Sequence, residues 1–165
     1  MRPTAARPRY PARMRQPSSR TCFVCGRENP LGLSARWDSD VAKGEVRATL
    51  EIPEHFNGFP GVVHGGVLSA LLDEAAVRTA LLDGGFDDLM VTAKLEVAFR
   101  RPTPTRTPVT IVGRLVQRTG SRAKAEAEVL LPDGTVAARA EALLARPPSD
   151  VAASWEEERA HWKVA

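Results

Sequence analysis

The stretch GFPGVVHGGVLSALLDEAA, residues 58–76, decides the fold of this 165-residue chain. A Gly/Pro loop leads into His64, after which apolar residues recur every three or four positions, at Leu68, Leu71, Leu72, Ala75 and Ala76. This spacing places them on one face of a helix. We expect a helix from His64 to about Leu82, ended by Gly84 and Gly85, because glycine commonly follows the last helical turn.

Stretches with a period of two flank this helix. Residues 31–37 and 43–52 before it predict a hairpin, with Val46, Ala48, Leu50 and Ile52 on one face of the second strand. Residues 88–99 predict a long strand with one buried side, and residues 108–118, 122–131 and 135–145 predict three more. The buried side of the long strand is predicted to carry Leu89, Val91, Ala93, Leu95, Val97 and Phe99. The fold class is therefore α+β, an antiparallel sheet of five to six strands wrapped around one long central helix.

The domain organisation is simple. We expect a disordered basic tail over residues 1–20, one folded domain over 21–146 and a helical extension over 147–165, where Trp155 and Trp162 share one helix face. The sequence has no apolar run near the roughly 20 residues that span a membrane, which predicts a soluble protein with no membrane partner. We place it in the cytoplasm.

The charge distribution argues against nucleic-acid binding. Six of the 23 basic side chains are arginines in residues 1–20, whereas all 20 acidic side chains lie beyond that tail. Phosphate binding needs cations gathered on a folded surface, and the folded part is slightly acidic. The Arg-rich start also resembles a targeting peptide, although four prolines would break an amphipathic helix there.

Cys22 and Cys25 form a single CxxC pair in CFVCG. A structural zinc site usually takes four protein ligands, so this pair is half a site unless His55 or a second subunit completes it. Three interpretations remain open: ordinary packing or turn residues, a redox-labile pair, and a metal shared between chains.

The helix start has the chemistry of an oxyanion pocket. The first N–H groups of a helix lack partners within the helix and carry partial positive charge. Gly65 and Gly66 leave these groups uncovered, with His64 at the helix mouth. Such donors stabilise the negative oxygen that develops when a carbonyl is attacked. A tight entry turn, with His64 as a capping group, is the alternative explanation.

Asp73 is the candidate base. Its neighbours on the helix surface are mostly small or apolar, and burial of a carboxylate raises its pKa and its basicity. Glu74 has a simpler explanation, since Arg78 lies four residues later, as in a solvated helix pair. We keep Glu74 as a second candidate.

The spacing of these groups predicts a shared site. Gly65 and Asp73 are eight residues apart, which is about 12 Å along a helix axis, so they cannot act on the same carbonyl within one chain. If both act on one substrate, they come from two subunits, and the site lies at a dimer interface.

The motif HGG followed by an acid, between a hairpin and four strands, resembles the hotdog-fold thioesterases of the PaaI-like type, and CFVCGRENPLGL resembles the amino-terminal segment of one subgroup. The resemblance covers about residues 22–146. It implies a homodimer paired through its sheets, or a homotetramer, that hydrolyses acyl-CoA thioesters without metal or cofactor. Gly65 N–H would polarise the carbonyl, and Asp73 would activate water or attack directly.

Other site positions of the resembled family are matched less completely in this chain. Some relatives have an Asn six residues before the histidine, where this chain has Gly58, with Asn57 beside it. Thr92 fits a Ser/Thr position on the first strand after the helix. Because side chains alternate along a strand, Thr92 is predicted on the face opposite to that of Leu95, which is the polar face. Val77 replaces a Thr found four residues after the acid in other relatives. Val63, Arg101 and Arg122 complete the expected substrate-binding residues, the arginines as partners for the phosphates of coenzyme A.

Two other functions remain as alternatives. EHFNGFPGVV, residues 54–63, resembles the histidine loop of hotdog hydroxyacyl-carrier-protein dehydratases, but their helix acid would fall at Ser69 or Ala70. A non-catalytic module that binds acyl thioesters would keep Gly65 and the pocket without needing Asp73, since a fold alone does not establish activity.

Overall fold

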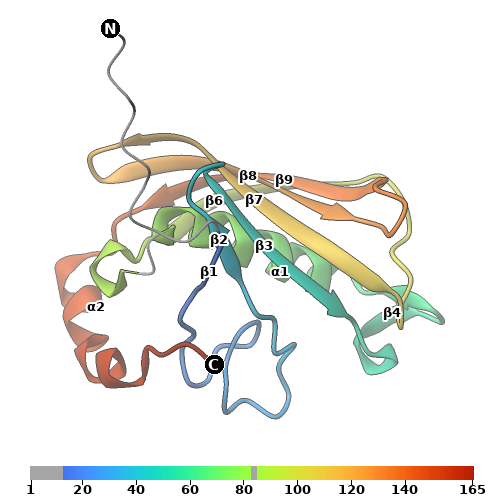
Figure 1. The fold of residues 1–165 in the computed structure, drawn as a ribbon, viewed down its shortest axis with the longest axis horizontal. Helices are drawn as coiled ribbons and strands as arrows, with labels where there is room; N and C mark the ends of the chain where they lie inside the picture. The colour runs from blue at the N-terminus through green and yellow to red at the C-terminus, as the bar shows by residue number, and fades with distance from the viewer. Residues whose placement is uncertain (1–12, 83–84) are drawn as a thin grey trace, which may run out of the picture.

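The computed structural model describes residues 13–82 and 85–165. A seven-stranded antiparallel sheet, in the order β1-β2-β3-β7-β8-β9-β6, curves over one central helix (Figure 1). Its strands are β1 (Met14–Arg15), β2 (Asp38–Asp40), β3 (Glu45–Glu51), β6 (Val91–Phe99), β7 (Pro108–Thr119), β8 (Arg122–Leu130) and β9 (Val136–Ala145). The predicted sheet around one helix is confirmed, with β1 and β2 as additional short strands.

The central helix α1 (Gly65–Arg78) continues for one 3₁₀ turn, η2 (Thr79–Leu81). Its buried face includes Leu68, Leu71, Leu72, Ala75 and Ala76, the residues whose spacing predicted it. The predicted end lies close to the observed one, although Gly84 falls outside the described residues. A two-stranded sheet of β4 (Asn57–Phe59) and β5 (Val62–Val63) precedes the helix, after the 3₁₀ turn η1 (Glu54–Phe56).

Small side chains let the sheet approach the helix closely. The inward residues of β8 are Ala123, Ala125, Ala127 and Val129, and each is buried. At Gly113 in β7, an added Cβ would lie 2.4 Å from the carbonyl oxygen of Ala75. Only glycine fits at this crossing, because real Cβ atoms do not come so near a backbone oxygen.

The first predicted strand was wrong. Residues 31–37 form no strand: Leu31 lies in a turn, and Ser34 has a positive φ of 53°, although Leu33, Ala35 and Trp37 are buried alternately. The N–H groups of Leu33 and Ala35 instead donate to the carbonyls of Phe23 and Val24 in the cysteine loop. Strand β2 lies later, at residues 38–40, which we expected to form a turn. The alternation of apolar residues correctly predicted which side chains are buried, but it could not predict which segment their backbone groups bond to.

The boundary of the tail also needs correction. Residues 1–12 lie outside the described residues, but residues 13–20 belong to the folded domain. Strand β1 pairs with β2, and Gln16 is buried beneath it. The Gln16 side-chain amide donates to Ser39 Oγ and to the Leu81 carbonyl, both at 2.8 Å. These contacts fix the segment against the end of the central helix.

The carboxy-terminal extension is two short pieces rather than one helix. The structure has α2 (Ser149–Ser154) followed by the 3₁₀ helix η4 (Glu156–His161), with Trp155 at the junction. Trp162 follows η4 and packs on Phe86, with ring centroids 5.8 Å apart, so the two tryptophans do not share a helix face. Phe86 begins η3 (Phe86–Asp88).

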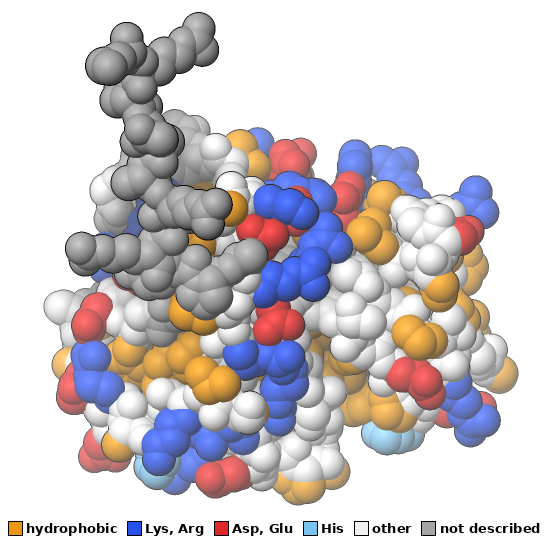
Figure 2. All heavy atoms as spheres, viewed as in Figure 1, with side chains coloured by type: hydrophobic (Ala, Val, Ile, Leu, Met, Phe, Trp, Pro, Cys, Tyr) orange, Lys and Arg blue, Asp and Glu red, His pale blue; other side chains and the backbone are white. Residues whose placement is uncertain are grey.

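Charged side chains on the face drawn in Figure 2 lie in mixed clusters, with basic and acidic groups side by side. Several are directly paired in the sheet, such as Arg114, which contacts both Glu45 and Glu128. Among the described residues, no helix is long and apolar enough to cross a membrane.

Candidate active site

The N-terminus of α1 presents one uncommitted donor. His64 is the N-cap, and its Nδ1 accepts the N–H of Gly66 at 2.8 Å. The Gly66 N–H, the second predicted oxyanion donor, therefore already donates to the His64 side chain. The Gly65 N–H has no acceptor within residues 13–82 and 85–165. Neutral His64 must carry its proton on Nε2, because Nδ1 accepts.

An aromatic ring covers Gly65. A Cβ added at Gly65 would lie 3.3 Å from Cζ of Phe99, the last residue of β6. Phe99 itself is 53% exposed, so its ring forms part of the surface beside the helix start. Sequence reasoning placed Phe99 only on the buried face of its strand and missed this contact. The one available signal was a large aromatic residue at a strand end, which is not specific.

Asp73 lies half-buried on α1 and has one strong polar partner. The hydroxyl of Thr92 donates to Asp73 Oδ1 at 2.6 Å. Burial raises the pKa of the Asp73 carboxyl, the Thr92 hydrogen bond opposes that rise, and the neighbouring charge of Glu74 adds to it. The net direction is upward, as expected for a carboxylate that serves as a base.

The predicted orientation of Thr92 was wrong, and a bulge explains the difference. In the pairing of β6 with β9, Thr92 lies opposite Leu144 and Lys94 opposite Leu143, which leaves Ala93 as an extra residue. An extra residue reverses the alternation on one side of it. Thr92 therefore faces the helix, although simple parity from Leu95 places it on the other face. Ala93, which we expected on the buried face, is exposed.

Glu74 pairs with Arg78 as the spacing predicted, but the pair is not solvated. Arg78 Nε donates to Glu74 Oε1 at 2.7 Å, and the Arg78 side chain is only 2% exposed. Its guanidinium also donates to Gln16 Oε1, to the Pro17 carbonyl and to Cys25 Sγ. Glu74 therefore balances a buried cation, whereas the polar partner of the Asp73 carboxylate is the neutral hydroxyl of Thr92.

The expected substrate-binding residues are spread over the chain. Asn57 is exposed in β4, opposite the buried Val63, whose N–H donates to the Thr103 carbonyl. Arg101 follows β6 beyond Phe99, and Arg122 begins β8; both are exposed. They lie at opposite ends of the sheet. One chain does not bring the two arginines together.

The Asn position of some relatives is sterically restricted here. A Cβ on Gly58 would lie 3.2 Å from His64 Cα and 3.3 Å from its Cδ2. The position thus packs directly against the helix cap, and glycine leaves no side chain to order the site. Ser69, where a dehydratase would carry its acid, donates its hydroxyl to the Gly65 carbonyl at 2.9 Å.

One group of side chains has the composition of a metal site. The side-chain ligand atoms of Cys22, Cys25 and Glu74 lie within 4.8 Å of one another. His55, which we considered as a further ligand, is not in this group; it is exposed, with its ring 4.4 Å from that of Phe56. Arg78 already supplies a positive charge to both Cys25 and Glu74.

Comparison with known proteins agrees with this architecture. Residues 60–138 match the family model described as the thioesterase superfamily. A solved thioesterase superfamily protein is 31% identical, with a TM-score of 0.68 over 75% of this chain and 62% of that one. The chain has the hotdog fold of the thioesterase superfamily. The PaaI protein of the E. coli phenylacetic acid degradation operon shares this hotdog fold, at 17% identity and a TM-score of 0.57, over 63% of this chain and 77% of that protein.

A curated relative is the acyl-coenzyme A thioesterase THEM4 of Rattus norvegicus. It is 25% identical over 100 residues, which are 61% of this hotdog chain. The chain spans 42% of the length of that relative. These matches confirm the resemblance to PaaI-like thioesterases.

Proposed function

We propose that this protein hydrolyses acyl-CoA thioesters to a free acid and coenzyme A. The observation that carries the proposal is that helix α1 bears both groups. The half-buried carboxylate of Asp73 accepts a hydrogen bond from Thr92, and the first N–H of the helix, at Gly65, has no acceptor among the described residues. A base and an oxyanion donor are the two groups that thioester hydrolysis requires. The name of the THEM4 relative supports this substrate class.

In the proposed reaction, the thioester carbonyl oxygen accepts the Gly65 N–H at the positive end of α1. Asp73 either removes a proton from an attacking water or attacks the carbonyl carbon itself. Negative charge then develops on the carbonyl oxygen, where the helix N-terminus stabilises it. Collapse of the intermediate breaks the carbon–sulfur bond and releases the thiolate of coenzyme A, which then takes up a proton. When water attacks, this step gives the free acid directly; when Asp73 attacks, it leaves an acyl–Asp73 anhydride, which a water molecule hydrolyses to release the acid and restore the carboxylate. Thr92 holds the carboxylate in position for this step.

The two groups meet in a homodimer. Within one chain Gly65 and Asp73 are about 12 Å apart along the helix axis. Strand β6 is an edge of the sheet, so its outer N–H and C=O groups are available to a second copy. Antiparallel self-pairing about its centre, near Leu95, sets Phe99 of one protomer beside Thr92 of its partner. Phe99 contacts Gly65 and Thr92 contacts Asp73, so two complete sites form per dimer.

The same pairing gathers the two arginines. Ala145 of β9 lies opposite Val91 of β6 and opposite Arg122 of β8, which places Arg122 at the starting end of β6. Arg101 lies beyond the other end of β6. Across the two-fold axis, Arg101 of one protomer and Arg122 of its partner reach the same site mouth. Together they would bind the phosphates of coenzyme A.

The primary test measures free thiol released from a panel of short, medium, long and aromatic acyl-CoAs. Turnover by the wild type that falls by about 10²–10⁴-fold in Asp73→Asn supports the proposed base. Wild-type turnover that survives in Asp73→Asn would exclude Asp73 as that base. Binding of acyl-CoA without any turnover would replace hydrolysis with a non-catalytic binding module.

A second test asks whether each site is shared. Gly65→Pro removes the donor but suits the first helical position, and His64 already has the extended backbone that precedes proline. Gly65→Ala keeps the N–H and controls for crowding against Phe99. Mixed with Asp73→Asn, the inactive Gly65→Pro protein should regain activity, because one site per heterodimer combines two intact groups. A mixture that stays inactive although heterodimers form would contradict the shared site.

A further inference from the structure

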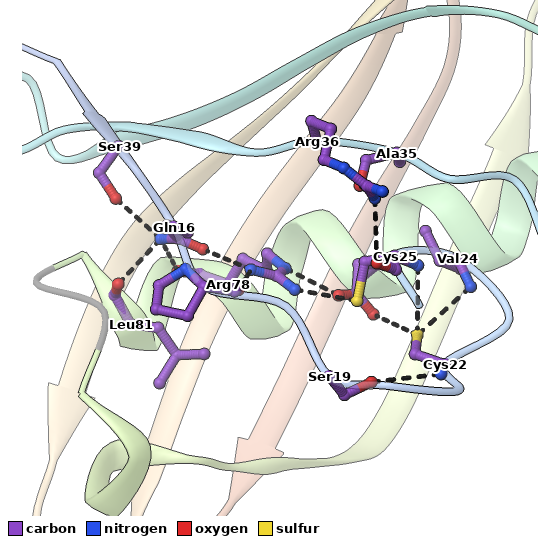
Figure 3. Close-up of polar contacts among 12 residues, drawn as sticks. Gln16, Ser19, Cys22, Val24, Cys25, Ala35, Arg36, Ser39, Arg78 and Leu81 are labelled. Carbon is purple, nitrogen blue, oxygen red and sulfur yellow. Dashed lines mark hydrogen bonds and ion pairs between the residues drawn. The ribbon is translucent and has the colours of Figure 1, made fainter. Parts of the chain in front are cut away.

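The cysteine loop presents the Cys22 sulfur to two backbone donors. The N–H of Val24 lies 3.3 Å from Cys22 Sγ, and that of Cys25 lies 3.4 Å from it (Figure 3). Gly26 closes the turn, since its N–H donates to the Cys22 carbonyl and an added Cβ would lie 2.4 Å from that oxygen. The loop thus holds a conformation that favours negative charge on Cys22.

The two sulfurs have unequal surroundings. Cys25 is 2% exposed, and Arg78 Nη2 lies 3.0 Å from its sulfur. Cys22 is partly exposed, and its sulfur lies 3.9 Å from Glu74 Oε2. The sulfurs are within 4.8 Å of each other, so small side-chain movements bring them to bonding distance. Cys22 is the accessible thiol, and Cys25 is the shielded one.

We propose that Cys22 and Cys25 form a thiol–disulfide exchange site, in which Cys22 attacks a small external disulfide and Cys25 resolves the product. The nearby pocket, of about 150 Å³, is lined by both cysteines and by side chains that include Ser19, Val77 and Trp162. Of the two cysteines that line it, Cys22 is the more exposed. This site is separate from the acyl-thioester chemistry and does not depend on it.

The electrons and protons balance over two displacements. The Cys22 thiolate attacks one sulfur of the external disulfide, forms a mixed disulfide and expels the first thiolate. Cys25 loses its proton to that thiolate, attacks the Cys22 sulfur and expels the second. The protein dithiol gives up two electrons and becomes the Cys22–Cys25 disulfide, while the external disulfide is reduced to two thiols.

The hydrogen bonds and charges around the two thiols support this order of attack. The thiol hydrogen bond from Cys25 lowers the pKa of Cys22 to about 7, assisted by the backbone N–H groups and opposed by burial and by Glu74. The same hydrogen bond is the largest cause of a raised pKa at Cys25, followed by burial and Glu74. Once Cys22 is in a mixed disulfide, that cause disappears, and Arg78 still stabilises the Cys25 thiolate. Arg36 donates to the backbone carbonyls of Cys25 and Ala35, and no contact of Arg36 with either cysteine sulfur is found among the described residues.

A bound divalent cation fits these groups less well than thiol exchange. The guanidinium of Arg78 lies at hydrogen-bonding distance from both Cys25 and Glu74, where a metal would add a second positive charge. Buried charges need compensation of opposite sign, and the carboxylate of Glu74 is already balanced. Dithiol chemistry requires no additional charge.

The experiment uses the full chain and glutathione disulfide as the probe. Mass spectrometry should show the wild type losing two hydrogens, without lasting glutathione attachment, and dithiothreitol should reverse the change. Cys25→Ser should accumulate the mixed disulfide at Cys22, whereas the matched Cys22→Ser should react at least tenfold more slowly. The rate for Cys25→Ser should rise with pH as the Cys22 thiol ionises.

Three results would overturn the proposal. The first is a persistent mixed disulfide on the wild type, and the second is equal reactivity of the two single variants. The third is stoichiometric zinc that survives dialysis against a chelator and protects both thiols from alkylation, which would assign a metal site instead. If either variant fails to fold, alkylation of the native wild type followed by peptide mapping decides the question: Cys22 must react first.

Discussion

Asp73 illustrates how the proposed activity costs stability at a single residue. Its pKa is raised above the usual value of 3.8, so the unfolded chain releases this proton at lower pH than the folded chain does. The free energy of unfolding therefore falls as pH rises from about 3.8 through the folded-state pKa. Asp73→Asn removes this dependence while its amide oxygen still accepts from Thr92.

We therefore expect Asp73→Asn to be at least as stable as the wild type at pH 7, although its thioesterase activity is lost. The advantage should shrink as pH falls below the ordinary pKa of an aspartate, where both states of the wild type are protonated. Thermal unfolding of both proteins at a series of pH values measures this difference. A variant clearly less stable at pH 7 would mean that the carboxylate is held by favourable contacts instead.

The Thr92 hydroxyl should set the pH range of activity. Its hydrogen bond favours the ionised form of Asp73, so Thr92→Val, which has the same shape without the hydroxyl, should raise the Asp73 pKa further. The acidic limb of the profile of kcat/KM against pH should then move to higher pH. Thr92→Ser is the matched control and should restore the wild-type limb. An unchanged acidic limb in Thr92→Val would show that the Thr92 hydroxyl does not affect the pKa of the catalytic base.

At the scale of elements, Arg78 joins three parts of the chain that are distant in sequence. It links α1, the β1 segment and the cysteine loop through Glu74, Gln16, Pro17 and Cys25 (Figure 3). Its guanidinium also stacks on Trp162, with the central carbon 5.7 Å from the ring centroid. One buried cation thus connects both ends of the described chain to the helix.

Arg78→Met should destabilise the protein by about 3–5 kcal/mol, because it leaves the Glu74 carboxylate and the acceptor oxygens of Gln16 and Pro17 without their donor. Chemical denaturation of the variant and the wild type gives this difference. Arg114→Met is the matched control: Arg114 pairs with two carboxylates where Arg78 pairs with one, but it is 42% exposed, and we expect a loss of about 1 kcal/mol or less. Similar losses from both variants would show that burial does not distinguish the two networks.

Hydrophobic period predicted the elements that keep one regular face toward the core. The helix and the strands after it were visible because each keeps one regular face toward the core, as β8 does with its alternating alanines. The same reasoning failed at Thr92, because one bulged residue reverses a face without altering composition. It also failed at Gln16, whose partners Ser39 and Leu81 lie 23 and 65 residues away. Such contacts follow from tertiary packing alone.

At the scale of the whole molecule, the proposed site makes activity depend on assembly. Each chain carries its donor and its base about 12 Å apart on one rigid helix, and side-chain movement cannot close that distance. The exposed edge of β6 is the element that would supply the missing half from a second copy. A folded monomer would then hold two incomplete sites, whereas a dimer would hold two complete ones.

Specific activity should therefore fall on dilution as the dimer dissociates, while far-ultraviolet circular dichroism stays unchanged. Sedimentation velocity over the same concentrations gives the fraction at twice the 17.9 kDa chain mass, and activity per chain should follow that fraction. Tetramers would appear as a further species whose loss on dilution leaves activity intact, because pairing through β6 already completes the sites. Full activity in a sample that sediments as monomer would contradict the shared site and would require Gly65 and Asp73 to act on different groups of the substrate.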